Sequence, residues 1–265
     1  MKAKNMIENA ISWLKGGMHV FMRKTRHSLT DGGNVKPENM IMNAMSWYEK
    51  GMRFSEMNKF TESINSFDKA LSLDSANEYI WLAKGVAFIK MDRKAEGLHC
   101  FDKAVEINPQ NSVAWFNKGT TLRRLEKYAE ANTCFELALA IDPNDADIWC
   151  NKALTLAEGL SRVEESLKCY EKALQLQPRH IDALLNYGCT LGSLDRDTEA
   201  LVILNRALDV NSKDRDVWIS KAVALMKLGR AIEAIKCLEM FLKLSGNSSD
   251  PRIEGAKEMI KQLSS

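Results

Sequence analysis

The sequence predicts an all-α protein built as a solenoid of stacked helix pairs. Three observations support this prediction: tryptophan recurs at a constant interval, small residues keep the register of the tryptophans, and the composition is that of an ordinary folded chain. The chain has 265 residues, of which 45% are hydrophobic and 27% charged, and its formal net charge is +2. The tryptophans lie 34 residues apart at Trp13, Trp47, Trp81, Trp115 and Trp149, and Trp218 resumes the series after one skipped unit and one inserted residue.

Small and aromatic residues follow the tryptophans at fixed distances. Four residues after each one stands Gly17, Gly51, Gly85, Gly119 or Ala153, and the series continues at Gly188 and Ala222. A second set, 20 residues after, is Phe67, Phe101, Phe135, Tyr170, Leu204 and Leu238. The first set lies on one face of a first helix and the second set on a second helix. Small residues let the two backbones approach closely, and the large ones fill the space beside them.

Capping residues mark where each helix begins and ends. Asn111, Asp145 and Asp214 stand where the first helices need an N-cap. Pro109, Pro143 and Pro178 fall where the second helices should have ended. These signals predict helix pairs that are joined by short turns.

The 34-residue period, with Trp, Gly, aromatic, Ala and Pro in this order, resembles the tetratricopeptide repeat. The resemblance implies a right-handed superhelix of helix-turn-helix units. Six full units are expected, at residues 44–77, 78–111, 112–145, 146–180, 181–214 and 215–248. The fourth contains one extra residue between Gly159 and Arg162, which we expect to lengthen the turn between its two helices.

The two ends of the chain differ from the repeats. Residues 1–43 are predicted to hold an N-terminal helix, a degenerate repeat and a loop, because residues 6–18 copy residues 40–52 but no second helix follows. Residues 249–265, which Pro251 opens, are predicted to form a C-terminal capping helix. Open-ended solenoids require such caps.

The resemblance also implies where a ligand binds. Members of this family bind peptides in a concave groove lined by the first helix of each unit, at its second, fifth, sixth, ninth, twelfth and thirteenth positions. In this chain the corresponding apolar, aromatic and cationic residues include Tyr48, Tyr79, Leu82, Phe116 and Arg123. The polar and acidic ones are Asn117, Asn151, Asn186, Asp147, Asp182 and Asp216.

Two rows of polar residues can each be interpreted in two ways. One row is the three asparagines at the sixth position, and the other is the three aspartates at the second. An asparagine row can hold the backbone of an extended peptide through its amide donors and acceptors, yet asparagine is also simply common at this position. The aspartates can attract a basic segment, or they can serve the N-terminal ends of their own helices through capping and the helix dipole. The sequence leaves both pairs of alternatives open.

One family activity is not expected. Co-chaperone members grip an acidic C-terminal peptide with lysines and asparagines at fixed first-helix positions. The corresponding residues here are Tyr48, Met52, Tyr79, Val86, Val113, Asp147 and Asn151, which form no such carboxylate clamp.

The sequence offers no catalytic, cofactor or metal site. It contains no phosphate-binding glycine loop, nucleophile elbow or zinc-protease helix, and none of its four histidines belongs to a recognisable motif. Cys100, Cys134, Cys169 and Cys237 occupy one equivalent repeat position, so they should lie about 10 Å apart, too far to share a metal or a disulfide. Cys150 and Cys189 are expected to face the groove in adjacent units.

The predicted function is therefore that of a non-enzymatic scaffold that binds an extended or helical peptide of another protein. The near-balanced charge gives no reason to expect nucleic acid or a membrane as partner. A cytoplasmic protein is expected, because neither a signal peptide nor a membrane span is evident. The alternatives are a self-assembling structural protein, which would form a homo-oligomer, and a non-catalytic regulatory subunit of an enzyme complex.

Overall fold

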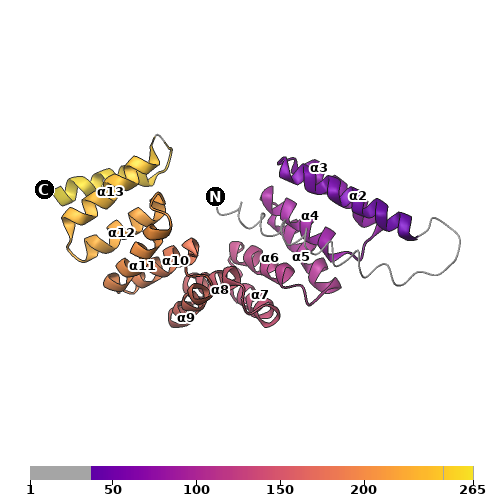
Figure 1. Ribbon diagram of the computed structural model, residues 1–265, viewed down its shortest axis with the longest axis horizontal. Helices are drawn as coiled ribbons and strands as arrows, with labels where there is room; N and C mark the ends of the chain where they lie inside the picture. The colour runs from indigo at the N-terminus through magenta and orange to yellow at the C-terminus, as the bar shows by residue number, and fades with distance from the viewer. Residues whose placement is uncertain (1–36, 247, 265) are drawn as a thin grey trace. The chain divides into compact units, whose positions relative to one another are not determined.

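The computed structural model describes residues 37–246 and 248–264, and within these ranges it contains thirteen helices and no strand (Figure 1). The all-α class and the repeated helix pairs are thereby confirmed. The chain divides into two compact units, here called the N-terminal unit, up to Pro143, and the C-terminal unit, from Asn144. The helix expected over residues 1–24 lies outside the described residues.

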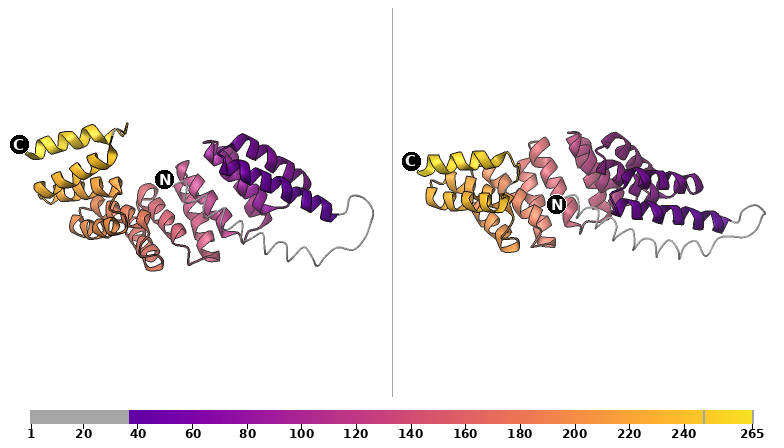
Figure 2. Two further views of the ribbon diagram at one scale, coloured as in Figure 1. Left: turned by 45° about the horizontal axis from the view of Figure 1, so that its top comes forward. Right: turned by 90° about the horizontal axis from the view of Figure 1, so that it is seen from above.

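The N-terminal unit consists of three helix pairs, and the helices of each pair lie side by side (Figures 1 and 2). Its helices are α2 (Pro37–Glu56), α3 (Phe60–Leu73), α4 (Glu78–Lys90), α5 (Lys94–Ile107), α6 (Ser112–Arg124) and α7 (Tyr128–Ile141). The first helix α2 begins at Pro37, earlier than residue 44, where the first repeat was expected to start.

The C-terminal unit contains three more pairs and a final single helix. Its helices are α8 (Ala146–Gly159), α9 (Val163–Leu176), α10 (Ile181–Ser193), α11 (Asp197–Val210), α12 (Arg215–Lys227), α13 (Ala231–Ser245) and α14 (Arg252–Ser264). The final helix α14 packs on α13 through the buried Ala256 and four half-buried apolar residues, Ile253, Met259, Ile260 and Leu263.

Side-chain caps begin the first helix of a pair, as predicted from Asn111, Asp145 and Asp214. The Asn111 Oδ1 accepts from the backbone N–H of Ala114, and Asp145 and Asp214 each accept two backbone N–H groups. The second helices lack such caps and instead follow a turn residue with left-handed backbone. These turn residues are Asn58, Asp92, Glu126, Ser161, Asp195 and Gly229.

The extra residue of the fourth repeat lies in a different place from the one expected. The turn between α8 and α9 contains three residues, 160–162, as does the turn between α4 and α5. The helix α8 has 14 residues, whereas α4 and α6 have 13. The insertion therefore extends the last turn of α8, and the prediction of a longer loop was wrong.

The recurring tryptophan fixes the turn that leads into each first helix. The indole Nε1 of Trp81 donates to the carbonyl of Ser75 at 3.0 Å, and Trp115 and Trp218 make the same bond to the residue six positions earlier. A lysine three residues later lies over each of these rings, for example Lys84 at 5.2 Å from the Trp81 ring centroid. In these three repeats the tryptophan thus ties the first helix to the turn that precedes it.

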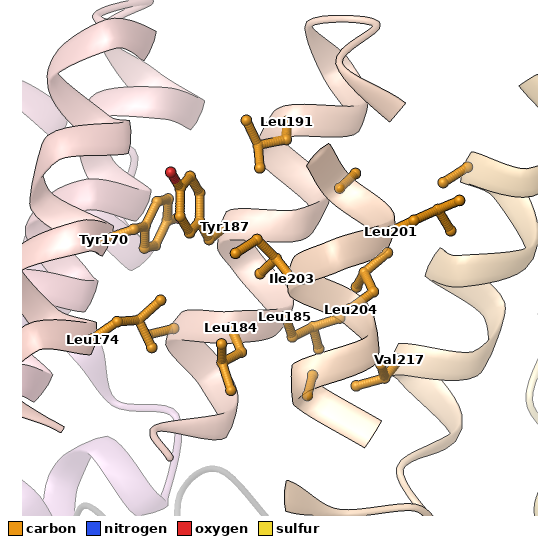
Figure 3. Packing of buried hydrophobic residues seen from close by; sticks show 14 of the residues in the cluster. Tyr170, Leu174, Leu184, Leu185, Tyr187, Leu191, Leu201, Ile203, Leu204 and Val217 are labelled. Atoms are coloured by element: carbon orange, nitrogen blue, oxygen red, sulfur yellow. The ribbon is translucent and has the colours of Figure 1, made fainter. Parts of the chain in front are cut away.

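The fifth repeat keeps its packing although it lacks the tryptophan. Leu184 occupies the tryptophan register, and Tyr187 stands where the neighbouring repeats have lysine. The Tyr187 ring stacks on that of the fully buried Tyr170, with 5.7 Å between centroids (Figure 3). Its hydroxyl donates to Glu171 at 3.1 Å, and burial beside this carboxylate raises the pKa of Tyr187 to about 12. Ring stacking therefore replaces the tryptophan contact here.

Candidate peptide-binding surface

The fifth position of the first helices belongs mainly to the core. Leu82 is completely buried against Phe101 and Ala104, and Tyr48 is 6% exposed and packs against Phe67 with 5.9 Å between ring centroids. Both residues were expected to line a binding surface. They are buried instead, because each packs against the second helix of its own pair, Tyr48 on Phe67 and Leu82 on Phe101. Phe116, the equivalent in the third repeat, stays half-buried.

A row of half-buried apolar side chains lies on the first helices α2, α4 and α6 of the N-terminal unit. We call it the apolar strip, and it consists of Met45, Met52, Tyr79, Val86 and Val113. Four of these residues pack against the same core cluster around Leu82, so one core supports the strip on all three helices.

A buried hydroxyl lies beneath the strip. Burial raises the pKa of Tyr48 well above its ordinary value, and the nearby Tyr79 adds to this effect. The Tyr48 hydroxyl finds no hydrogen-bond partner among the residues that the structure describes. Burial also raises the pKa of Tyr79, together with the charge of Glu78. Both phenols therefore stay protonated at neutral pH.

Three cations lie at the C-terminal ends of α4 and α6: Lys90, Arg123 and Arg124. Burial lowers the pKa of Lys90, and repulsion from Arg124 lowers it further. Arg123, one of the predicted site residues, is half-buried, whereas Arg124 is exposed. The apolar strip is thus followed by positive charge at the C-terminal ends of α4 and α6.

The asparagine row is engaged with its own helices. The Nδ2 of Asn117 donates to the carbonyl of Val113 at 2.8 Å, and that of Asn151 to the carbonyl of Asp147 at 2.9 Å. Asn117 is 8% exposed, while Asn151 and Asn186 are half-buried. One amide hydrogen of Asn117 and one of Asn151 are used, so either side chain can offer an extended peptide at most one donor and its side-chain oxygen.

The aspartate row is also largely used inside the C-terminal unit. Asp147 bonds through Oδ1 to the Nε2 of His180 at 3.0 Å, and Asp216 to the guanidinium of Arg252 at 2.8 Å. Asp182, the third member, is half-buried. Two of the three carboxylates therefore hold together neighbouring elements of the fold.

His180 was given no role by sequence reasoning, and this was wrong. Its Nδ1 accepts from the backbone N–H of Ala183 at 3.3 Å, so it is the N-cap of α10. Because Nδ1 accepts, the proton lies on Nε2, which donates to Asp147. The available signal was its register, since His180 stands where Asn77, Asn111, Asp145 and Asp214 cap the other repeats.

The cysteines are separate, and five of the six are buried. Burial raises the pKa of Cys100 and of Cys134 to about 11, so these thiols stay protonated and unreactive at neutral pH. Cys189 is exposed, and its thiol lies 3.4 Å from the Ser220 hydroxyl, whereas Cys150 is buried rather than surface-facing. Within the described ranges, no group of three or more His, Cys, Asp or Glu residues could hold a metal ion.

None of the helices that the structure describes is long and apolar enough to cross a membrane.

Comparison with known proteins identifies the repeats. Family models of the tetratricopeptide repeat match residues 44–77, 79–111 and 146–180, and a second such model matches residues 100–131. With the helix pairs described above, these matches show that the chain is a tetratricopeptide repeat protein, as its sequence pattern indicated. No curated protein matches it by sequence.

Solved structures share the fold at low sequence identity. YrrB, described as a tetratricopeptide repeat protein with an unusual peptide-binding site, is 19% identical with a TM-score of 0.56, over 72% of this chain and 97% of YrrB. MamA from Desulfovibrio magneticus is 18% identical with a TM-score of 0.60, over 65% of this chain and 97% of that one. Yeast Tom70 is 22% identical with a TM-score of 0.62, over 84% of this chain but 47% of Tom70.

Proposed function

We propose that this protein is a non-enzymatic scaffold that binds a peptide segment of a partner protein across the first helices of its N-terminal unit. The apolar strip carries this proposal. A repeat fold of this kind supports a role in protein interaction, and the strip is the surface that we propose for the contact. Its five side chains come from three helices that are equivalent in the repeat, so one segment can cross all three.

The chemistry of the strip favours an apolar or aromatic segment over a carboxylate tail held in a clamp. Met52, Tyr79, Val86 and Val113 stand where clamp-type members carry lysine and asparagine. Burial of apolar area contributes about 25 cal/mol per Å², so a few apolar side chains on the strip supply most of the affinity. The peptide-binding site named in the description of YrrB is a further reason to look for peptides.

Peptide display on the whole protein tests this proposal. A library of random peptides is selected on the wild type, and the selected peptides are then measured against two variants, Val113→Asp in the strip and Val202→Asp on α11. Val202 is 58% exposed, so its substitution places the same charge on a surface outside the strip. We expect Val113→Asp to weaken binding at least about tenfold and Val202→Asp to leave it unchanged.

Thermal unfolding of both variants accompanies the binding measurement, which excludes unfolding as the cause of lost affinity. Equal binding by wild type and Val113→Asp would show that the strip is not the site. Self-assembly is the second candidate, and light scattering over a range of concentrations decides it, because a strict monomer excludes it.

A further inference from the structure

We propose that the segment bound by the apolar strip is acidic at one end, with apolar residues over Tyr79, Val86 and Val113 and carboxylates beside Lys90 and Arg124. This inference rests on the proposed function and names the chemistry of its ligand.

Repeat equivalence places the apolar and charged groups in separate rows. The first helices α2, α4 and α6 are successive neighbours and hold equivalent positions in their repeats. The second and ninth positions supply the strip, and the thirteenth supplies Glu56, Lys90 and Arg124. Lys90 follows Val86 by four residues on the same helix, a rise of about 6 Å. A segment that covers the strip therefore needs its charge only one or two residues beyond its last apolar contact.

Cations outnumber carboxylates in the charged row. Lys90 and Arg124 stand there with the single carboxylate of Glu56, and Arg123 is next to Arg124 at the twelfth position. Lys90 is half-buried, and the mutual repulsion with Arg124 already lowers its pKa, so an anion between the two would relieve an unfavourable interaction. The excess positive charge favours an acidic ligand over a neutral or basic one.

The helix dipole alone does not explain this cluster. A cation at the C-terminal end of a helix is stabilised by about 0.3–1 kcal/mol wherever it occurs. In the C-terminal unit, however, α8 and α10 have no basic residue in their last turns. Lys227 at the end of α12 is held by the carboxylate of Asp195 at 2.9 Å and by the carbonyl of Gly192. The concentration of cations is specific to the N-terminal unit.

The charge of the chain's own N-terminal residues argues against an internal occupant. Residues 1–36 contain seven Lys and Arg but only Glu8 and Asp31 as acids. A segment with this composition repels the cations at the ends of α4 and α6. Residues 1–36 therefore do not match these cations in charge, and a partner protein with an acidic segment does.

Three synthetic peptide mixtures test the inference on the full chain. Each carries the same randomised apolar and aromatic core of five residues, followed by Asp-Glu, Ser-Ser or Lys-Arg, with an amidated C-terminus and a fluorescent label. We expect fluorescence anisotropy to show that the Asp-Glu mixture binds at least about tenfold tighter than the Lys-Arg mixture. This preference should fall as the salt concentration rises.

A charge reversal locates the effect. Arg124→Glu should abolish the preference for the Asp-Glu mixture, whereas Lys213→Glu, which makes the same change at an exposed position of the C-terminal unit, should retain it. Equal binding of the three mixtures would overturn the acidic ligand but leave the proposed function standing. Failure of all three mixtures to bind, up to millimolar concentration, would overturn both.

Discussion

The two units have the same repeat but differ where the helices of a pair meet. In the N-terminal unit, a glycine of each first helix faces the ring of Phe67, Phe101 or Phe135, and a Cβ added at Gly51 or Gly85 would approach that ring to 2.5–2.6 Å. In the C-terminal unit, Ala153 and Ala222 already carry a Cβ in this register, and Gly188 is the remaining glycine.

Their exposed first-helix positions differ as well. The N-terminal unit presents the apolar strip and a row of cations, whereas in the C-terminal unit Asp147 and Asp216 bond to His180 and Arg252. The exposed first-helix positions thus carry apolar and cationic groups in one unit and carboxylates that hold neighbouring elements together in the other. This difference shows that equivalent repeat positions need not share a role, since neighbouring residues decide whether a side chain is used internally.

Close packing between the two helices of a pair gives the largest expected effect on stability. Gly85→Ala should destabilise the protein by about 1–3 kcal/mol, because its new Cβ meets the fully buried Phe101 ring and neither backbone can yield without loss of packing. Denaturant unfolding followed by circular dichroism measures this change.

Gly255→Ala is the matched control. A Cβ at this position in α14 meets no atom within 4 Å, so the substitution should stabilise the helix by about 1 kcal/mol through helix propensity. If Gly85→Ala were equally harmless, close approach of the two helices would not explain why the N-terminal unit keeps its glycines.

Loss of the His180 N-cap of α10 should have the next largest effect on the free energy of unfolding. His180→Ala removes the acceptor for the Ala183 N–H and the bond to Asp147, and should cost about 1–2 kcal/mol. His180→Asn restores the type of cap that Asn111 provides in the N-terminal unit but not the bond to Asp147, so its free energy of unfolding should lie between those of wild type and His180→Ala. Identical stability of the two variants would mean that the cap contributes nothing.

We expect a smaller, pH-dependent effect on thermal stability from the ion pairs that attach α14. Arg252 and Arg215 hold the pKa of Asp250 far below its ordinary range. A lowered folded-state pKa adds stability above the unfolded pKa, about 3.9 for aspartate, and this stability is lost as the pH falls through the folded pKa. The melting temperature of Asp250→Asn should therefore lie below that of wild type by a constant amount from pH 7 to about 5, and this gap should narrow below about pH 4.

Asp209→Asn serves as the control for loss of one negative charge at an exposed position of the same unit. A gap for Asp250→Asn that persists unchanged to the lowest pH at which the protein is folded would contradict the ion-pair explanation.

Local signals predicted most of the fold. The caps at Asn111, Asp145 and Asp214, and the prolines after α5, α7 and α9, placed the helix ends because they act on backbone within a few residues. The burial of Tyr48 and Leu82 could not be predicted in this way, since it depends on how they pack against Phe67 and Phe101 of the second helices. The bond between His180 and Asp147 joins residues 33 positions apart, and no local pattern encodes it.

The candidate surface was predicted in outline. Family register placed Tyr79 and Arg123 on the first helices correctly, but it treated every repeat alike. Only the contacts of Asn117, Asn151 and the aspartates showed that these groups are already bonded within their own unit. Which first-helix side chains are already bonded within the fold therefore emerged from the structure.

The central claim is that the peptide binds to the N-terminal unit. The most direct test compares how two valine variants, one in each unit, bind the Asp-Glu peptide mixture. Val86 and Val223 hold the same repeat position, on α4 and α12, and each is replaced by Asp. Anisotropy titrations should show at least about a tenfold loss of affinity for Val86→Asp and none for Val223→Asp, with both variants folded. Equal losses, or a loss for Val223→Asp alone, would contradict the assignment of binding to the N-terminal unit.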